Sequence, residues 1–214
     1  MGNNILTPRQ TAVLTAAAHE PSITKNFILS GGTALAGFYL FHRDSEDLDF
    51  FSENEVQLPP IIAWLKTLKR SIGYSTIDIQ TSFNRNLIFL KFPNETLKCE
   101  FTYYPFPTLE EGLTHYGLRI DSMLDIAVNK TFTISQQPRA RDFIDLYCIF
   151  QKEKEWTIAD LLKKARMKFD WHVDPVQFGA QLLRANTIAD LPRMRMKLAE
   201  RTWRQFFVKI AAQF

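Results

Sequence analysis

Two glycines and two aspartates lie close together near the start of the chain, at Gly31, Gly32, Asp47 and Asp49. Glycine allows the backbone to come close to a bulky anion, and the N–H groups at a helix start point toward such an anion. Carboxylates are ligands that divalent cations prefer in proteins, and phosphate oxygens commonly share these cations. The residue types and their spacing therefore indicate a site that holds a nucleoside triphosphate together with divalent metal ions.

Short elements on either side must position these residues. Residues 26–30 have an apolar strand pattern, residues 32–42 have a helical pattern, and residues 47–52 have a second strand pattern. Because residues i and i+2 of a strand share a face, Asp47 and Asp49 are both expected to point toward the turn formed by Gly31 and Gly32, here called the glycine corner.

The pattern Gly-Gly-Thr-Ala-Leu, followed by Arg-x-Ser-x-Asp-x-Asp-Phe, resembles the AbiEii/AbiGii toxin-type branch of the nucleotidyltransferase superfamily. That branch comprises nucleotidyltransferase toxins of bacterial toxin–antitoxin and phage-abortive systems. The resemblance implies that Asp47 and Asp49 hold Mg²⁺ or Mn²⁺, and that Gly31 and Gly32 bind the phosphates of a nucleoside triphosphate. At the level of individual motifs it extends over about residues 25–150.

Three polar residues of this first motif have roles that the sequence leaves open. Thr33 either caps the helix after the glycines or touches phosphate. Arg43 either contacts phosphate, braces the strand that carries the two aspartates, or compensates the dipole at the end of its helix. Ser45 belongs to the same motif and is expected to contribute to nucleotide binding with Arg43.

A third carboxylate is expected on a later strand, because two-metal phosphoryl transfer commonly uses one. In the superfamily it is Asp or Glu between apolar residues, and Glu100 lies between Cys99 and Phe101. The resemblance implies that Glu100 helps to bind a metal ion and to deprotonate the attacking hydroxyl group. The alternative is an ordinary strand glutamate that faces solvent together with Thr102.

Two later helical motifs extend the resemblance. Lys130 matches the lysine of one family helix, and residues 139–146 match the family motif Arg-x-Arg/Lys-Asp-x-x-Asp-Leu. The resemblance places Lys130 on the triphosphate oxygens and gives Asp142 and Asp145, one helical turn apart, a supporting polar role. The alternatives are a surface lysine, carboxylates that favour the helix dipole, and a local pair between Arg141 and Asp145.

The rest of the chain predicts an α/β (α+β) protein. Three strands are expected at residues 74–81, 87–92 and 96–104, with turns at residues 84–86 and 93–95. Helices are expected at residues 8–20, 59–70, 121–133 and 139–151. Three more helices are expected to start at about residues 157, 174 and 193. The resemblance implies a nucleotidyltransferase-type mixed sheet with flanking helices in residues 1–115. A helical domain in residues 116–214 is then expected to complete the active site and bind the acceptor.

Composition is that of an ordinary globular protein, with 46% hydrophobic and 23% charged residues. No apolar run reaches the length of a membrane span, and residues 1–4 lack signal-peptide character, so a cytoplasmic location is expected. Cys99 and Cys148 are expected to be small buried hydrophobes, since they have no zinc-ligand spacing. The four histidines are scattered and predict no transition-metal site.

Charge is distributed unevenly. Residues 1–150 carry 13 Lys and Arg against 16 Asp and Glu, whereas residues 151–214 carry 13 against 7. The basic segment of residues 151–214 would suit a polyanionic substrate. Basic residues are, however, also common on exposed helix faces that bind nothing. The helix expected from about Arg193 carries Trp203 and Phe207, which should dock it on the body of the protein.

The sequence and the resemblance predict a metal-dependent nucleotidyltransferase that moves a nucleoside monophosphate from a triphosphate to a hydroxyl group. The expected acceptor is an RNA, such as the 3′ end of a tRNA, and the expected partner is a separately encoded antitoxin, with no membrane. One alternative is a small-molecule adenylyltransferase of the antibiotic-modifying kind. Another is a non-catalytic nucleotide- or RNA-binding protein, against which the intact Asp47 and Asp49 pair argues.

Overall fold

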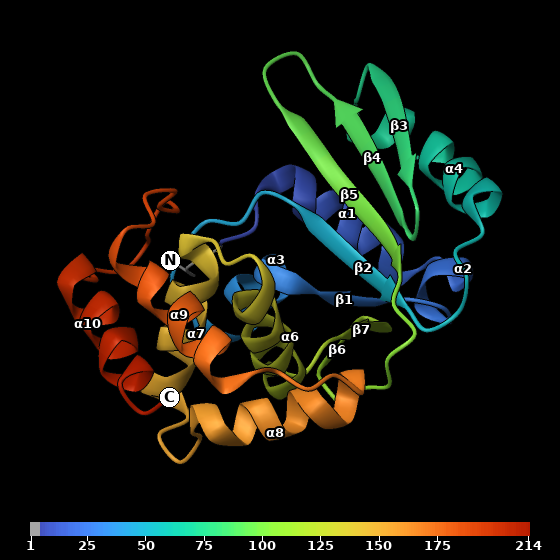
Figure 1. Ribbon diagram of the computed structural model, residues 1–214. Coiled ribbons are helices and arrows are strands. Elements are labelled where there is room, and N and C mark those ends of the chain that lie inside the picture. Colours follow the sequence, from blue (N-terminus) through green and yellow to red (C-terminus); the bar gives the residue numbers. More distant parts are fainter. Residues whose placement is uncertain (1–4) are drawn as a thin grey trace. The chain divides into compact units, whose positions relative to one another are not determined.

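A computed structural model describes residues 5–214 (Figure 1). Residues 1–4, on which part of the argument against a signal peptide rests, lie outside the described residues. The chain forms two compact units, and the predicted α/β class is confirmed. The first unit contains the chain up to Tyr39, Ser45–Pro107 and Glu111–Ser122, and the second contains Leu40–Asp44, Thr108–Glu110 and Met123–Phe214.

The first unit is built on a mixed sheet of seven strands in the order β3-β4-β5-β2-β1-β7-β6. The strands are β1 (Ile28–Ser30), β2 (Leu48–Ser52), β3 (Thr76–Ser82), β4 (Arg85–Lys91), β5 (Thr96–Tyr103), β6 (Thr114–His115) and β7 (Leu118–Ile120). The pairs β1–β7 and β2–β5 are parallel, and the other neighbours are antiparallel. No strand was expected for β6 and β7, because two or three residues are too few to show an alternating pattern.

Strand alternation separates an apolar face of this sheet from a polar one, and the face that carries Asp49, Lys98 and Glu100 is called the polar sheet face below. Phe50 of β2 and Phe101 of β5 are fully buried, and their rings stack with centroids 4.8 Å apart. Asp49 and Glu100, which precede them in the sequence, are register partners on the opposite face. The apolar residues therefore hold two acidic side chains side by side.

The helices of this unit include α1 (Pro8–Ala18), α2 (Pro21–Thr24), α4 (Leu58–Thr67) and α5 (Lys69–Ile72). Thr7 caps α1 through a capping box with Gln10, and Gly73 ends α5 in a left-handed conformation. The helix expected at residues 8–20 ends two residues earlier, since Glu20 caps a separate short helix that starts at Pro21.

The helix expected at residues 32–42 is shorter than predicted. It consists of α3 (Gly31–Leu35) and a π-helical turn, η1 (Ala36–Leu40). Phe41 has a φ of +54°, a left-handed conformation that cannot continue a right-handed helix. The turn expected at residues 84–86 is also wrong, because the β3–β4 ladder continues until Ser82 pairs with Arg85, leaving a two-residue loop.

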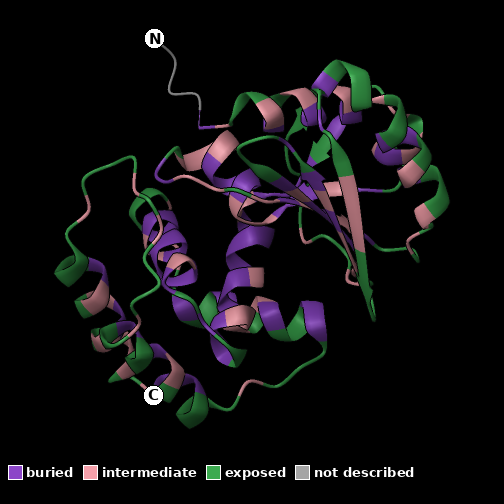
Figure 2. Cartoon of the chain, turned by 90° about the horizontal axis from the view of Figure 1, so that it is seen from above, coloured by how far each residue is buried: buried purple, intermediate pink, exposed green. Residues whose placement is uncertain are grey.

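The second unit is helical: α6 (Met123–Gln136), α7 (Ala140–Lys152), α8 (Ile158–Phe169), α9 (Pro175–Leu183), a 3₁₀ turn η2 (Arg184–Asn186) and α10 (Glu200–Ala211). Figure 2 shows helices of this unit buried along one side and exposed along the other. Trp203 and Phe207 of α10 are buried against Phe143 of α7, with ring centroids 6.3 and 5.0 Å from it. The predicted docking of the basic helix is confirmed.

This last helix begins at Glu200 and not near Arg193. An isolated antiparallel bridge joins Arg43 to Met194 instead, with Asp44 N donating to Arg193 O and Arg195 N donating to His42 O. This pairing with residues 42–44 holds residues 193–195 in a non-helical conformation. Both cysteines are buried and free, as expected. Among residues 5–214, no helix is long and apolar enough to cross a membrane.

Candidate active site

The glycine corner lies directly against Asp49. Ser30, the residue before it, pairs with Asp49 across β1 and β2. Gly31 has a φ of +72°, and a Cβ atom there would collide with Asp49 Oδ2 and lie 3.1 Å from Asp49 Cγ. Glycine is therefore required at position 31 both by the backbone conformation and by the approach of the carboxylate.

Asp47 is held next to the same corner by two contacts. The buried Thr33 hydroxyl donates a hydrogen bond to the backbone carbonyl of Asp47, so that this hydroxyl fixes the chain just before β2. The Asp47 side chain forms an ion pair with Lys98, with Nζ 2.8 Å from Oδ2. Thr33 thus serves the chain that carries Asp47, while its predicted phosphate contact stays a prediction.

Glu100 is a buried carboxylate with several donors around it. Arg85 donates to it twice, at 2.6 and 2.8 Å, and the Thr102 hydroxyl donates at 3.0 Å. Burial opposes ionisation of Glu100, but the Arg85 guanidinium, Thr102 and Lys98 more than offset it and lower the pKa of Glu100. Glu100 is 5% exposed and Thr102 9% exposed, so the solvent-facing alternative is wrong.

Arg85 and Lys98 are two residues of this cluster that sequence reasoning missed. Lys98 lies two residues before Glu100 on the same strand, so strand alternation alone could have placed it on the acidic face. Arg85 could not be found in this way, because the predicted turn removed it from β4. Its side chain reaches Glu100 only through the pairing register of β4 and β5.

The second unit contains a separate network of buried charges centred on Asp145. Asp145 Oδ1 accepts from Arg43 Nε at 2.6 Å and lies 2.7 Å from His42 Nε2, and Oδ2 lies 2.7 Å from both Arg43 Nη2 and Lys130 Nζ. Lys130 Nζ also donates to Asp142 at 2.9 Å. The four predicted polar residues of this part of the chain, Arg43, Lys130, Asp142 and Asp145, therefore belong to one connected network.

Neighbouring opposite charges favour the charged forms of Asp145, Asp142 and Arg43. Burial opposes a charge on Asp145, yet Lys130 and Arg43 hold its pKa well below the usual value. Burial likewise opposes a charge on Asp142, but Lys130 outweighs it and lowers the pKa of Asp142. Burial alone would lower the pKa of Arg43, but Asp145 outweighs it and raises that pKa. Within the described residues, His42 Nδ1 is buried with no hydrogen-bond partner.

Several alternatives for these residues can now be decided. Lys130 is 8% exposed, so it is not a surface lysine, and Asp145 pairs with Arg43 rather than Arg141. Asp142 does act at the start of α7, where it accepts from the Arg139 backbone N–H at 3.1 Å. Direct contacts of Lys130, Asp145, Arg43 and Ser45 with a nucleotide stay predictions.

Two of the three predicted metal ligands suit a divalent cation. Asp47 and Asp49 offer the carboxylate oxygens that Mg²⁺ or Mn²⁺ prefers, and a cation, the Lys98 ammonium group, already lies on Asp47. In residues 5–214, no three His, Cys, Asp or Glu side chains lie close enough together to hold a metal ion. Glu100 would join such a site through a carboxylate lone pair that its hydrogen bonds to Arg85 and Thr102 leave over.

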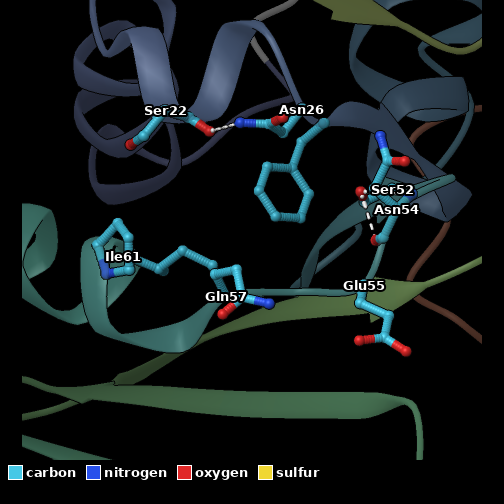
Figure 3. A pocket seen from close by; sticks show the side chains of 9 residues that line it. Ser22, Asn26, Ser52, Asn54, Glu55, Gln57 and Ile61 are labelled. Atoms are coloured by element: carbon cyan, nitrogen blue, oxygen red, sulfur yellow. Dashed lines mark hydrogen bonds between the residues drawn. The ribbon is translucent and has the colours of Figure 1, made fainter.

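A cavity of about 110 Å³ also lies in the first unit. Phe27, just before β1, and Ser52, at the end of β2, line it, whereas Gly31 and Asp49 lie at the other ends of these two strands. Figure 3 shows Ser22, Asn26, Ser52 and Asn54 around it. None of the predicted site residues lines this cavity. This cavity is therefore separate from the predicted site.

Known proteins share this fold. A protein of H. pylori provisionally named a nucleotidyltransferase is 21% identical with a TM-score of 0.59, and the alignment covers 97% of this chain and 95% of that one. JHP933 from Helicobacter pylori is 23% identical with a TM-score of 0.58, over 96% and 88% of the two chains. No curated protein sequence matches the chain.

A family model described as the nucleotidyl transferase AbiEii toxin of type IV toxin–antitoxin systems matches residues 12–213. The match extends beyond residues 25–150, where the individual motifs were identified, and includes the helices of the C-terminal part. Gly31, Gly32, Asp47, Asp49, Lys130 and Asp142 all lie within the matched range. The chain is a nucleotidyltransferase of the AbiEii toxin family of type IV toxin–antitoxin systems.

Proposed function

We propose that the protein transfers a nucleoside monophosphate from a nucleoside triphosphate to a hydroxyl group of an RNA, such as the 3′ end of a tRNA. The acceptor oxygen would form a bond to the α-phosphorus, and the bond from that phosphorus to the pyrophosphate oxygen would break. The proton of the acceptor hydroxyl would pass to a carboxylate or water, and pyrophosphate would leave. An Mg²⁺ or Mn²⁺ ion would stabilise the negative charge that develops on the phosphate oxygens.

The observation that carries this proposal is the contact of Gly31 with Asp49. Because Gly31 has no side chain, the Asp49 carboxylate can lie directly against the backbone at the start of α3, where it would share a divalent cation with a bound phosphate group. Asp47 lies two residues before Asp49, and Glu100 is the register partner of Asp49. An anion-binding corner beside such carboxylates is suited to phosphoryl transfer, in which positioning and electrostatics do most of the work.

The residues of the proposed site then have separate roles. Asp47 and Asp49 would hold the divalent cation, and the backbone at Gly31 and Gly32 would approach the phosphates. Glu100 is ionised and held by Arg85, so it would act as an anionic group that orients the metal ligands or accepts a proton. The protein would thereby supply a fixed set of charges before the substrate binds.

The acceptor is proposed to be a polyanion because exposed cations gather near the C-terminal end of the chain. Lys197, Arg201 and Lys209 are exposed, and no ion pair is seen for them in the described part of the chain. Such cations can follow a phosphate backbone without reading its sequence. A separately encoded antitoxin is the partner proposed from the family, and it would act on this activity.

Labelling with α-³²P nucleotides tests the proposal. Purified protein is incubated with total RNA and each of the four triphosphates in turn, with Mg²⁺ or with EDTA. We expect one triphosphate or more to label RNA in the presence of Mg²⁺ only. Asp49→Asn should reduce labelling by about 100-fold to 1000-fold, the usual range for the loss of one preorganised charge-stabilising group.

Asp78→Asn is the matched control, because Asp78 lies on the same face of the sheet at β3 and outside the carboxylate cluster. It should label RNA like the unchanged protein. Labelling of small hydroxyl compounds instead of RNA would support the antibiotic-modifying alternative. Nucleotide binding without transfer to either acceptor would contradict the proposed activity.

A further inference from the structure

Lys98 is a cation of the sheet face that touches an aspartate of the proposed metal pair. Its Nζ atom lies 2.8 Å from Asp47 Oδ2 and 3.6 Å from Glu100 Oε2, and its side chain is 23% exposed. The ammonium group thus lies between two carboxylates, in contact with oxygens that a divalent cation would also use. Lys98 and a metal ion at Asp47 would compete for the same ligand.

This competition has a predictable direction. Two positive charges a few ångströms apart repel, and repulsion is strong where water is partly excluded. A lysine ammonium is a compact point charge on a flexible stem, so Lys98 can change partners by rotating its side chain. Once it leaves Asp47, its ammonium group can form a charge-assisted hydrogen bond to a phosphate group of the substrate.

Arg85 is not expected to move in the same way. Its guanidinium donates twice to Glu100, at 2.6 and 2.8 Å, so rotation would break two charge-assisted hydrogen bonds at once. Lys98 has one close carboxylate oxygen at 2.8 Å and a more distant one at 3.6 Å. Between Arg85 and Lys98, Lys98 is the displaceable cation.

We propose that Lys98 is a displaceable cation that couples the two ligands of the site. In the free protein it pairs with Asp47 and opposes the binding of a divalent metal. When metal and triphosphate bind together, it pairs with a phosphate oxygen and favours the complex. This proposal rests on the proposed function only in assuming that metal and triphosphate share the site.

The coupling requires effects of opposite sign on the two ligands. Lys98→Met removes the competitor of the metal, so Mn²⁺ should bind the free protein about tenfold more tightly, a change typical of one close charge. The same substitution removes a phosphate partner, so the Mn²⁺ complex of inorganic tripolyphosphate should bind about tenfold more weakly. A lysine that only stabilises the fold would not separate the two ligands in this way.

The experiment measures Mn²⁺ binding by electron paramagnetic resonance and Mn²⁺–tripolyphosphate binding by isothermal titration calorimetry, without turnover. Lys91→Met is the matched control, since Lys91 is an exposed lysine on the same face of the neighbouring strand. It should change neither affinity. Circular dichroism confirms folding, and Lys98→Gln, which keeps a polar side chain, should repeat the pattern if Lys98→Met does not fold.

The outcomes separate this proposal from the proposed function. Opposite shifts support the coupling even if the protein transfers no nucleotide, and that combination would refute only the transfer activity. A Lys98 variant that binds both ligands more weakly, or that binds Mn²⁺ more tightly with unchanged tripolyphosphate affinity, would overturn the coupling. Either result would overturn it even if the unchanged protein labels RNA strongly.

Discussion

Gly31 combines two constraints, a left-handed φ of +72° and close contact with Asp49. Gly31→Ala should therefore lower the free energy of unfolding by about 2 kcal/mol or more and also displace the Asp49 carboxylate. RNA labelling should fall together with stability. Urea unfolding and the labelling assay measure the two effects on the same preparation.

Gly73 allows the two constraints to be separated. It has a φ of +80°, but a Cβ atom there would have Arg9 Nη1 as its nearest contact, at 3.9 Å. Gly73→Ala should lower stability by only about 1 kcal/mol, through backbone strain, and should leave labelling intact. Equal losses of labelling in the two variants would show that the space beside Asp49 is unimportant.

Asp145 makes stability depend on pH with a defined sign. Its pKa is held well below the usual value, so it stabilises the folded protein above the pKa of an unfolded Asp, about 3.9, and this contribution is lost as the pH falls through the folded pKa. Asp145→Asn should cost about 3–5 kcal/mol at pH 7, because it leaves buried cations without a partner. The difference from the unchanged protein should shrink below about pH 4.

Urea unfolding at pH 7, 5, 4 and 3 tests this expectation. Asp142→Asn should show a smaller loss with the same pH dependence, and it serves if Asp145→Asn does not fold. Glu155→Gln, at an exposed carboxylate, should leave the pH dependence unchanged. A loss in Asp145→Asn that is constant from pH 7 to pH 3 would mean that its charge is not what stabilises the unit.

At the scale of elements, the cations of α10 have different roles. The Arg204 guanidinium donates to the carbonyl oxygens of Ala185 and Ile188, the latter at 2.9 Å, whereas Arg201 and Lys209 are exposed. Arg204 thus anchors α10 to η2 and the residues that follow it. The other two are available to a phosphate backbone.

Salt dependence separates these roles. Replacing Arg201 and Lys209 by Gln should flatten the slope of log K for RNA against log salt by about 0.7–0.9 for each phosphate that is no longer neutralised. Arg204→Gln should instead lower the free energy of unfolding by about 1–3 kcal/mol with little change in slope. RNA binding at several KCl concentrations measures this, and an unchanged slope in the Arg201 and Lys209 variant would exclude α10 from RNA binding.

At the scale of the whole molecule, each unit has an aromatic core of its own. Phe50 and Phe101 stack in the first unit, and Phe143 packs with Trp203 and Phe207 in the second. Burial of such side chains supplies most of the stability, so we expect the fold not to depend on a bound ion. EDTA should therefore abolish transfer while leaving the thermal unfolding midpoint within about 2 °C, a shift that corresponds to less than about 1 kcal/mol.

Differential scanning calorimetry with and without EDTA checks this expectation alongside the labelling assay. Addition of MnCl₂ beyond the EDTA should restore transfer without refolding. A large drop of the midpoint in EDTA would indicate a structural metal and would change the meaning of every carboxylate variant.

Local patterns in the sequence were sufficient for the parts of the protein that depend on near neighbours. Alternation along β2 and β5 predicted that Leu48 and Phe50 face the core and that Asp49 lies on the other face, since the period of a strand is set by its own backbone. Helix starts at Thr7, Thr157 and Asp174 followed from side chains that cap N–H groups within three residues. The spaced glycines and aspartates were enough to identify the family.

Tertiary structure decided the partners of the charged residues. Arg85 meets Glu100 across 15 residues and Arg43 meets Asp145 across 102 residues, so neither pair has a signal in local spacing. The non-helical segment before α10 depends in the same way on its bridge to residues 42–44, next to the left-handed Phe41. Periodicity and capping are properties of a segment by itself, whereas ion pairs and register exist only once the segments have packed together.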